Sequence, residues 1–412
     1  MTNPATSQIV RKRRVFYIPG YDPIHPRRYR ELYRKEGAAQ AQISGYDIGI
    51  APKDKSDVYG WHAQATIDGH ETTADIDVLV WSDIVRTSMS NSIAATYWQL
   101  IRTAWTYIAS GTLRRLMWMR KGPVIAALYP VGALLLQLLV ALLAASLVVN
   151  GGKALLVPYI GIVGQLIAIL AAVGLAYFIL DWFRRKDGKI YAYYLMHDFA
   201  HSARWNGAYG EAVEDRMKDF GSLISEALQS DADEVLVVGH SSGAHLAISI
   251  LADLIRAGRV PTTGAKLSFL SLGQVVPMVS FLPKAYRLRA DLAFLSTRDE
   301  ITWVDVTAPG DGCTFALCDP VSVTGVTPPG KRWPLIISAA FTQSLKPQTW
   351  KALRWRFFRL HFQYLCAFDA PLDYDYFQIT SGPTTLGERY KDRKSAKSRI
   401  DVPASKYTSL AP

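Results

Sequence analysis

The sequence predicts an α/β fold, with a mostly parallel sheet covered by helices on both faces and an inserted pair of long apolar helices. Short runs of branched apolar residues, of which 235–238 is the clearest, alternate with segments of helical periodicity. A glycine-rich turn follows 235–238 and opens a helix, as expected at the end of a buried parallel strand. Two stretches without charge, 123–149 and 155–180, interrupt this alternation. The 412 residues are enough for one large domain with an insertion.

The composition favours a membrane-associated protein over a nucleic-acid-binding one. Apolar residues make up 50% of the chain, at the upper end of the range for soluble proteins, and the excess lies in 123–180. The net charge of +11 and the pI near 9.4 are compatible with nucleic-acid binding, yet no motif of that kind accompanies them. Many basic residues flank the apolar region or lie in the terminal segments. We therefore expect contact with a membrane surface and no nucleic-acid partner.

The first residues and the cysteines indicate a reducing compartment. Residues 1–13 form a basic tail without an apolar core, which argues against a secretory signal. Cys313, Cys318 and Cys366 are odd in number and lack Cys-x-x-Cys spacing, so we expect neither a disulfide framework nor a zinc site. We expect these thiols to be small buried groups, and we expect no metal ion or organic cofactor.

The first part of the α/β domain is predicted at 14–89. It opens with a buried strand at 15–18, which the following Pro-Gly ends in a loop. A basic helix at 26–35 comes next, with Pro26 near its start. Turn residues then separate apolar clusters that indicate two or three strands, with antiparallel pairing through 67–70. These strands are expected at 46–52, 59–67 and 75–81.

Residues 90–122 are predicted to form an amphipathic helix. Its apolar positions recur at helical spacing and include Trp105, while Arg102, Arg114 and Arg115 interleave with them. This mixture of aromatic residues and arginine is typical of a helix at the bilayer interface. An ordinary amphipathic helix packed on the core of the protein is an equally good interpretation.

A transmembrane hairpin is predicted at 123–180. Its uncharged stretches, 123–149 and 155–180, are each long enough at ~1.5 Å per residue to cross a ~30 Å hydrocarbon core. Only the short polar turn 150–154 separates them; the alternative is a pair of buried core helices. Arginine and lysine flank both outer ends, whereas the turn carries Lys153 alone. By the positive-inside rule, we expect both termini and the globular parts in the cytoplasm.

The main part of the domain is predicted at 190–387. Its beginning, 190–229, is mostly helical, and a helix follows the strand 235–238. Residues 388–412 are polar, basic and poor in apolar side chains, so we expect a flexible tail there. The remaining strands are expected at 266–272, 301–306 and 333–341, and a further helix at 285–295. Residues 347–365, which contain His361, are expected to form a basic, aromatic helix or a helix plus a loop.

The sequence Gly239-His240-Ser241-Ser242-Gly243 is the candidate catalytic motif. A serine between two glycines, directly after a buried strand and before a helix, has the pattern of a nucleophile elbow. The turn would hold the Ser241 hydroxyl clear of the backbone, and Gly239 and Gly243 would leave room for the turn to close. The alternative is a glycine-rich connection whose serine only caps the helix.

A serine of this type needs a base, and His361 is the best candidate. After such an elbow the partners follow in the order Ser, then Asp or Glu, then His. Of the eight histidines, six precede Ser241, His245 lies one helical turn after it, and only His361 comes beyond the later strands. The alternative role for His361 is that of a residue on a helix surface beside Arg359.

The carboxylate that would orient this histidine is sought after the strand 301–306. Asp311 is the first choice, because a carboxylate in the Pro-Gly-Asp-Gly turn could reach an imidazole from the end of that strand. The alternative for Asp311 is a plain turn-forming residue. Asp305, inside the strand, is the second choice, and Asp319 is the third.

Two backbone N–H groups are expected to bind the oxyanion of the reaction. One belongs to Ser242, the residue after the nucleophile, and the other to Tyr21, whose loop directly follows the strand 15–18. The alternative for the Tyr21 loop is an ordinary turn.

Together these motifs resemble the α/β-hydrolase superfamily. Within it, the chain is similar to lipase-like serine hydrolases and to bacterial membrane-bound hydrolases of uncharacterised substrate. The resemblance covers 14–85 and 190–385, and the chain departs from the common pattern by lacking a His-Gly dipeptide before the oxyanion loop. The motifs that carry the resemblance are the elbow 239–243, the Ile-Pro-Gly-Tyr loop at 18–21, the strand end at 271–273 and the strand and loop at 303–311.

The resemblance implies a membrane-anchored serine hydrolase that cleaves an ester or a thioester through an acyl-enzyme on Ser241. His361 would take the Ser241 proton, and Asp311 would hold the imidazole. The substrate would be a small acyl compound, and the hairpin suggests one derived from lipid. The expected location is a bacterial inner membrane. Two alternatives remain: an acyltransferase that uses the same three residues, and a catalytically silent hydrolase-like membrane scaffold.

Overall fold

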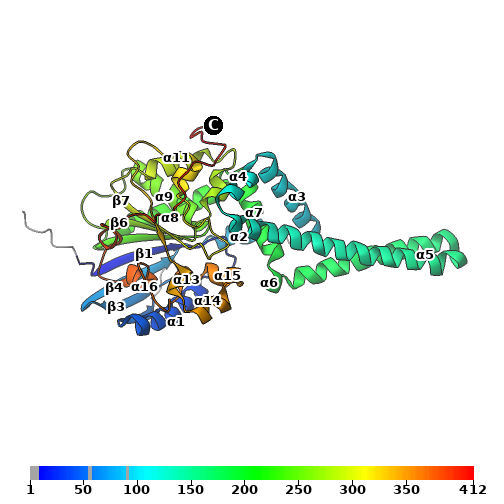
Figure 1. Ribbon diagram of the computed structural model, residues 1–412, viewed down its shortest axis with the longest axis horizontal. Helices are drawn as coiled ribbons and strands as arrows, with labels where there is room; N and C mark the ends of the chain where they lie inside the picture. Colours follow the sequence, from blue (N-terminus) through cyan, green and yellow to red (C-terminus); the bar gives the residue numbers. More distant parts are fainter. Residues whose placement is uncertain (1–8, 54–57, 90–91) are drawn as a thin grey trace, which may run out of the picture. The chain divides into compact units, whose positions relative to one another are not determined.

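Residues 9–53, 58–89 and 92–412 are described by the computed structural model of the chain, shown in Figure 1. The chain divides into two compact units. The first comprises Met1–Arg86, Ser110–Pro123 and Trp205–Pro412, and the second comprises Thr87–Ala109 and Val124–Arg204. The first unit contains the sheet and every residue of the candidate site.

The first unit is built on a mixed sheet of eight strands. The strands are β1 Lys12–Ile18, β2 Asp47–Pro52, β3 Gly60–Ile67, β4 His70–Val78, β5 Glu234–His240, β6 Lys266–Leu272, β7 Ile301–Thr307 and β8 Leu335–Ser338. Their order in the sheet is β2-β3-β4-β1-β5-β6-β7-β8. The neighbours from β4 to β8 run parallel, whereas β2 pairs antiparallel with β3, and β3 with β4. The predicted α/β fold with a mostly parallel sheet is confirmed.

Helices cover both faces of this sheet. Those largely in the first unit are α1 Arg27–Ser44, α2 Ser82–Ser88, α4 Thr112–Met119, α8 Glu211–Leu228, α9 Gly243–Arg256, α10 Val276–Ser280, α11 Tyr286–Leu295, α12 Pro320–Thr324, α13 Phe341–Ser344, α14 Pro347–Leu353, α15 Phe357–His361, the short 3-10 helix Gln363–Leu365, α16 Tyr376–Ser381 and α17 Leu386–Arg389. Figure 1 shows α8, α9 and α11 over one face, and α1 and α16 over the other.

The central strand β5 has apolar side chains on both faces, so helices have to cover the sheet on both sides. Every residue of β5 is buried. Leu236 and Val238 pack in one cluster with Tyr29 and Tyr33 of α1, and the residues between them point to the opposite face because strand side chains alternate. A strand buried on both faces therefore appears in the sequence as an uninterrupted apolar run.

The β3–β4 hairpin has the predicted pairing. Ile67 lies opposite His70, and the two residues between them, Asp68 and Gly69, have positive φ angles of 53° and 76°. Two left-handed residues match the twist of a two-residue hairpin, which favours Asp-Gly at this position. The antiparallel pairing through 67–70 is confirmed, and β4 begins at His70 rather than at residue 75.

The helix predicted at 90–122 is two helices. The first, α3, is Ile93–Ala109 in the second unit, and α4 belongs to the first unit. Gly111 separates them with a φ of 73°, which ends regular helix. Each helix exposes tryptophan: Trp105 of α3 is 73% exposed and Trp118 of α4 is 60% exposed. Leu100, on another face of α3, is buried against the cluster around Leu134.

The second unit is dominated by α5, Lys121–Arg185, and also contains α6 Asp187–Ile190 and α7 Ala192–Ala203. Gly161 has non-helical angles (φ 54°, ψ −132°), so α5 consists of two helical arms that meet there. A Cβ atom on Gly152 would lie 2.4 Å from that of Ala168, which places the arms against each other, as Figure 1 shows. In the described part of the chain, α5 is the one helix long and apolar enough to cross a membrane, judged by length and composition.

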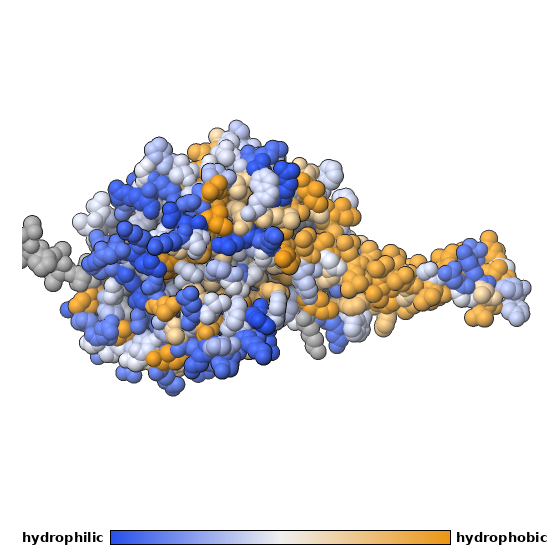
Figure 2. Space-filling model, in the orientation of Figure 1, coloured by the Kyte–Doolittle hydropathy of each residue, from blue (hydrophilic) through white to orange (hydrophobic). Residues whose placement is uncertain are grey.

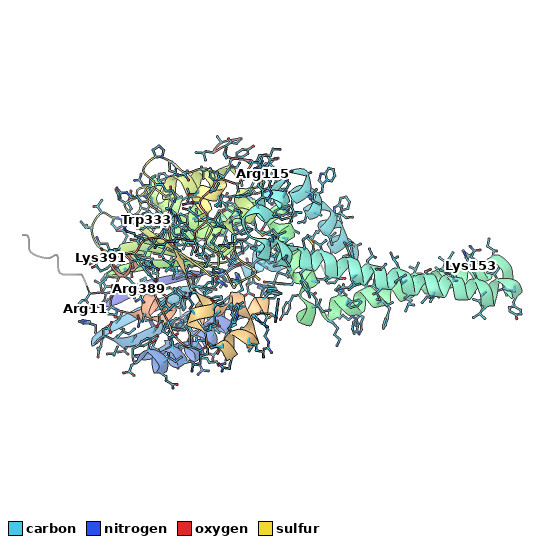
Figure 3. The ribbon with its side chains drawn as sticks, viewed as in Figure 1. Arg11, Arg115, Lys153, Trp333, Arg389 and Lys391 are labelled. Carbon is cyan, nitrogen blue, oxygen red and sulfur yellow. The ribbon has the colours of Figure 1, made fainter. Side chains whose placement is uncertain are left out.

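The chain reverses at Gly161 and not in the turn predicted at 150–154. Residues 150–154 continue the first arm as helix. Asparagine and glycine only weaken a helix, whereas Pro158 lacks an N–H and Gly161 adopts angles that other residues avoid. Figure 2 shows hydrophobic side chains along α5, and Figure 3 places Lys153 toward the end where the arms meet.

The basic N-terminal segment is part of the sheet. Strand β1 begins at Lys12, inside the tail predicted at 1–13, of which 1–8 lie outside the described residues. The Arg13 side chain is buried, with Nη2 at 2.6 Å from Glu234 Oε2 and Nη1 donating to Gly382 O at 2.6 Å. A guanidinium can be buried when its N–H donors are paired. The basic residues of this segment were therefore not sufficient evidence for a tail outside the sheet.

The C-terminal segment 388–412, predicted as a flexible tail, is hydrogen-bonded to the first unit. The Ile400 N–H donates to Leu317 O at 2.8 Å. Farther along, the buried Arg289 donates through Nε to Ser409 O at 2.7 Å. Backbone groups make such contacts without apolar side chains, which is why the composition of the segment did not predict them.

We expect Arg13→Met to lower the free energy of unfolding by ~3–5 kcal/mol, because it leaves the Glu234 carboxylate buried without its cation. Denaturant unfolding of the detergent-solubilised protein, followed by tryptophan fluorescence, measures this change. Arg11→Met is the matched control: Arg11 is exposed, so its loss should cost less than ~0.5 kcal/mol. Equal destabilisation by the two variants would contradict the role given to the Arg13–Glu234 pair.

Candidate functional site

The candidate site lies at the carboxyl ends of the parallel strands. Tyr21 follows β1, Ser241 follows β5, Gly273 follows β6 and Asp311 follows β7. His361 is the last residue of α15 and reaches the same edge from the C-terminal part of the chain. Loops after parallel strands meet at one edge of an α/β sheet, which is where such folds bind their ligands.

Ser241 occupies a strained turn between β5 and α9. Its φ is +56°, in the left-handed region that a residue with a side chain rarely adopts. The Ser241 N–H donates to Leu272 O at 2.9 Å, which ties the turn to the end of β6. This is the strand–turn–helix geometry predicted for the motif 239–243, and a helix-capping serine normally has β-region angles instead.

Glycine is required on both sides of this turn. A Cβ atom on Gly243 would lie 2.2 Å from Ile18 O, and one on Gly239 would lie 2.7 Å from the Cα of Ala244. Gly20, in the loop after β1, has the same restriction, because its Cβ atom would lie 2.9 Å from that of Ser241. The β1 loop therefore passes directly over the serine.

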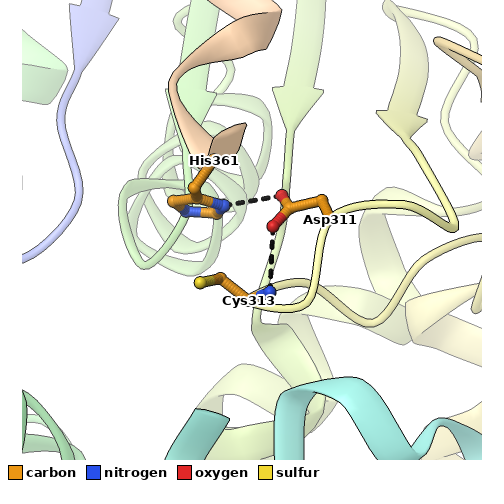
Figure 4. Close-up of side chains that lie close together, drawn as sticks. All are labelled: Asp311, Cys313 and His361. Carbon is orange, nitrogen blue, oxygen red and sulfur yellow. Dashed lines mark hydrogen bonds and ion pairs between the residues drawn. The ribbon is translucent and has the colours of Figure 1, made fainter. Parts of the chain in front are cut away.

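His361 and Asp311 form a buried pair. His361 Nδ1 lies 2.7 Å from Asp311 Oδ2, as drawn in Figure 4. The other carboxylate oxygen of Asp311 accepts the Cys313 N–H at 2.9 Å. Both side chains are buried, His361 with 7% of its surface exposed. The carboxylate can accept only, so the contact fixes the proton of the imidazole on Nδ1 and leaves Nε2 able to accept another.

The structure brings His361 beside the elbow without a hydrogen bond between the two side chains. Among the described residues, no hydrogen bond joins Ser241 Oγ to the His361 ring. Both residues lie at the end of β6. The Ser241 N–H is hydrogen-bonded to Leu272 O, and a Cβ atom on the next residue, Gly273, would lie 3.0 Å from His361 Cε1. Catalytic hydrogen bonds are often long before substrate binds, so this separation is compatible with catalysis.

His240 has a role in the site that the sequence did not predict. Its ring lies 4.8 Å from that of His361, measured between centroids, and its Nε2 lies 3.1 Å from His361 O. A carbonyl only accepts, so Nε2 carries the proton and Nδ1 accepts the Tyr17 O–H at 3.3 Å. Burial holds the pKa of His240 well below its usual range, so this histidine stays neutral. Its position before Ser241 was the only signal in the sequence.

The two predicted oxyanion donors lie together. The Tyr21 N–H donates to the Ser242 hydroxyl at 2.8 Å. Ser242 immediately precedes α9, where backbone N–H groups have no partner within the helix and point toward bound anions. Because the Ser242 side chain accepts from Tyr21, that hydroxyl has to turn away before the Tyr21 N–H can bind an oxyanion.

The two other carboxylates considered, Asp305 and Asp319, make different contacts. Asp305 is fully buried, and its Oδ1 accepts the Ser271 hydroxyl at 2.5 Å. Asp319 accepts N–H groups at the start of α12 and pairs with Lys331. Among the described residues neither is hydrogen-bonded to His361, so Asp311 alone has the geometry of the orienting carboxylate.

The three cysteines differ in their surroundings, and none is in a disulfide. Cys318 and Cys366 are buried, whereas Cys313 is half-buried beside the His361–Asp311 pair. The ligand atoms of Asp311, Cys313 and His361 all lie within 4.8 Å of one another, so these residues could hold a metal ion. The sequence did not predict this group, because His361 returns to the loop of Asp311 only through tertiary packing.

A pocket of about 340 Å³ borders the loop that carries Asp311. Aromatic rings and two guanidinium groups line much of it, and Ser241 and His361 are not among its lining residues. The glycines of the loop make room for the rings, since a Cβ atom on Gly310 would lie 2.6 Å from Trp350. The aromatic and arginine residues of the lining are Trp350, Trp355, Phe357, Arg120 and Arg354.

Comparisons with known proteins found no match to this chain, whether with family models, with curated proteins or with solved structures. The function is therefore inferred from the residues and their geometry.

The buried carboxyl of Asp305 predicts a pH-dependent stability. Burial raises the pKa of this group to about 8, far above its value of ~3.9 in an unfolded chain. The folded state therefore keeps the proton as the pH rises from about 4 to about 8, while the unfolded state loses it, and stability falls over that window. Asparagine does not titrate, so Asp305→Asn removes this loss of stability. The unfolding temperature of the variant, measured relative to that of the wild type, should therefore be higher at pH 8.5 than at pH 5. Thermal unfolding at both pH values checks this, and a difference independent of pH would contradict it.

Proposed function

We propose that the protein is a serine hydrolase of the α/β-hydrolase kind, which cleaves an ester or a thioester through an acyl-enzyme on Ser241. The observation that carries the proposal is the left-handed conformation of Ser241, at a turn that only glycine neighbours allow to close, beside the buried His361–Asp311 pair. Strained backbone of this kind is concentrated at functional sites. A serine that served only as a helix cap would not need it.

In the proposed reaction His361 acts first as a base and then as an acid. Asp311 holds the Nδ1 proton, so Nε2 is available to take the Ser241 proton as Oγ attacks the acyl carbon. The same Nε2–H protonates the leaving oxygen or sulfur. Water, deprotonated by Nε2, then attacks the acyl-enzyme, releases the acid and restores Ser241. Ser241 Oγ has to come within ~2.6–3.2 Å of Nε2 for the first transfer.

Backbone N–H groups would stabilise the oxyanion of the tetrahedral intermediate. The Ser242 N–H sits at the positive end of α9, and the Tyr21 N–H becomes a second donor once the Ser242 hydroxyl turns away. Loss of one such donor in comparable sites costs ~10²–10³ in rate.

We further propose that α5 anchors the protein in a membrane and that the substrate is derived from lipid. Side chains of both arms face outward, including Leu147 at 74% and Leu170 at 72% exposure, which supports lipid contact rather than core packing. The basic Arg184 and Arg185 at the end of α5 support a cytoplasmic location for the hydrolase domain. An anchored site would meet acyl compounds of the membrane at high local concentration.

We expect a fluorophosphonate probe to label the wild-type protein and not Ser241→Ala. The serine oxygen displaces fluoride from the probe and becomes phosphonylated only when a base and oxyanion donors activate it, so labelling reports the assembled site. In-gel fluorescence of the full-length protein in detergent measures it. Asp311→Asn should slow labelling by ~10³-fold or more, because the imidazole loses its orientation, whereas Asp305→Asn should slow it less than ~10-fold.

Three outcomes separate the proposal from its alternatives. Equal labelling of wild type and Ser241→Ala would remove Ser241 as the nucleophile. Absence of labelling in both would favour a catalytically silent scaffold. Transfer of the acyl group to an added alcohol in place of water, by a protein that does label, would identify an acyltransferase.

The topology is tested with introduced cysteines. In spheroplasts, a membrane-impermeant maleimide should react with Tyr159→Cys, which is 85% exposed and lies two residues before the reversal of α5 at Gly161, from outside the cell. Lys406→Cys, in the C-terminal segment, should react only after lysis. The reverse pattern would place the hydrolase domain outside the cytoplasm, and reaction of both sites after lysis alone would argue against a spanning hairpin.

A further inference from the structure

We propose that Asp311, Cys313 and His361 form a binding site for a thiophilic divalent cation such as Zn²⁺, and that an ion bound there switches the hydrolase off. The switching rests on the proposed function, whereas the binding of the ion does not. A carboxylate oxygen, a thiol sulfur and a ring nitrogen lie within 4.8 Å of one another, and Figure 4 shows that the three side chains lie close together.

The ligand set suits zinc. Zn²⁺ binds Cys, His and Asp together at distances of ~2.0–2.3 Å, and three protein ligands leave a fourth position for water. The thiol selects such ions over Mg²⁺ and Ca²⁺, which prefer oxygen. The nitrogen and oxygen are already adjacent, with His361 Nδ1 at 2.7 Å from Asp311 Oδ2. The Cys313 N–H donates to the same carboxylate at 2.9 Å, so one short loop holds two of the three ligands.

An ion can reach this group from solvent. Cys313 is only half-buried, and its neighbours Gly312 and Thr314 line the pocket of about 340 Å³ together with Asp311. The other cysteines offer no comparable site. Cys318 is buried. Cys366 accepts a hydrogen bond from the Arg359 guanidinium at 2.9 Å, and this positive charge would repel a cation.

Binding of the ion would remove His361 from the reaction. The ion takes the place of the proton between His361 Nδ1 and Asp311 Oδ2, and the Cys313 thiol releases its proton to solvent. The neutral ring then carries its one proton on Nε2, which can no longer accept the proton of Ser241. An ion placed on Nε2 instead would block the base directly.

Cobalt provides a readout that does not depend on activity. Full-length protein in detergent, without a polyhistidine tag, is titrated with Co²⁺ and then with Zn²⁺. The wild type should develop the near-ultraviolet thiolate-to-cobalt absorption with one ion per chain, and Zn²⁺ should displace it. Cys313→Ser should lack this absorption, while Cys366→Ser, the matched control, should retain it.

The second readout is the effect of Zn²⁺ on labelling by the fluorophosphonate probe. Zn²⁺ should slow labelling of the wild type by ~10-fold or more, and a chelator should restore the original rate. Labelling of Cys313→Ser should slow by less than ~2-fold, because loss of a ligand weakens binding of the ion. Absorption that is absent from the wild type, or that persists in Cys313→Ser, overturns the inference even if Ser241 labels normally. If Ser241 never labels but the Cys313-dependent absorption appears, the metal site stands and the proposed hydrolase function falls.

Discussion

The candidate site depends on the close crossing of two chain segments at Gly243. Any side chain there would overlap the carbonyl oxygens of Ile18 and Pro19, and backbone atoms cannot move aside as the end of a flexible side chain can. The end of β1 and the start of α9 are therefore held in contact. That contact carries the loop of Gly20 over Ser241 and brings the Tyr21 N–H to Ser242. One steric constraint thus sets the positions of the serine and of both candidate oxyanion donors.

Two further contacts hold the histidine. Asp311 binds its ring from the loop after β7, and the buried His240 binds its backbone carbonyl from the elbow itself. Because His240 is neutral and has a partner at each ring nitrogen, it adds no charge beside His361, the candidate base. The serine and the histidine are thereby joined through their neighbours, although their own side chains are not hydrogen-bonded.

Local patterns in the sequence predicted the local structure, and chain order predicted one distant contact. Four branched residues before a glycine-rich turn were enough for β5, the elbow and α9. The order of serine, carboxylate and histidine led to the observed contact of Asp311 with His361. Contacts that depend on tertiary packing have no such pattern in the sequence. Glu234 pairs with Arg13, which lies 221 positions away along the chain. Cys313 comes close to His361 only because α15 folds back to the loop after β7. Helix propensity also misled at 150–154, where the chain stays helical through weak helix formers and Gly152 packs against Ala168 of the other arm.

The reversal at Gly161 gives the two arms of α5 different lengths. From Gly161 to Arg184 the second arm extends ~35 Å at 1.5 Å per residue, and Lys153 lies ~12 Å from the reversal on the first arm. If Arg184 stays among the cytoplasmic headgroups, the tip barely passes a hydrocarbon core of ~30 Å, and the Lys153 ammonium must extend along its stem to reach water. A thicker bilayer would draw that charge into the hydrocarbon. The hairpin would thus favour thin membranes, and bilayer thickness would help to decide where in a cell the protein resides.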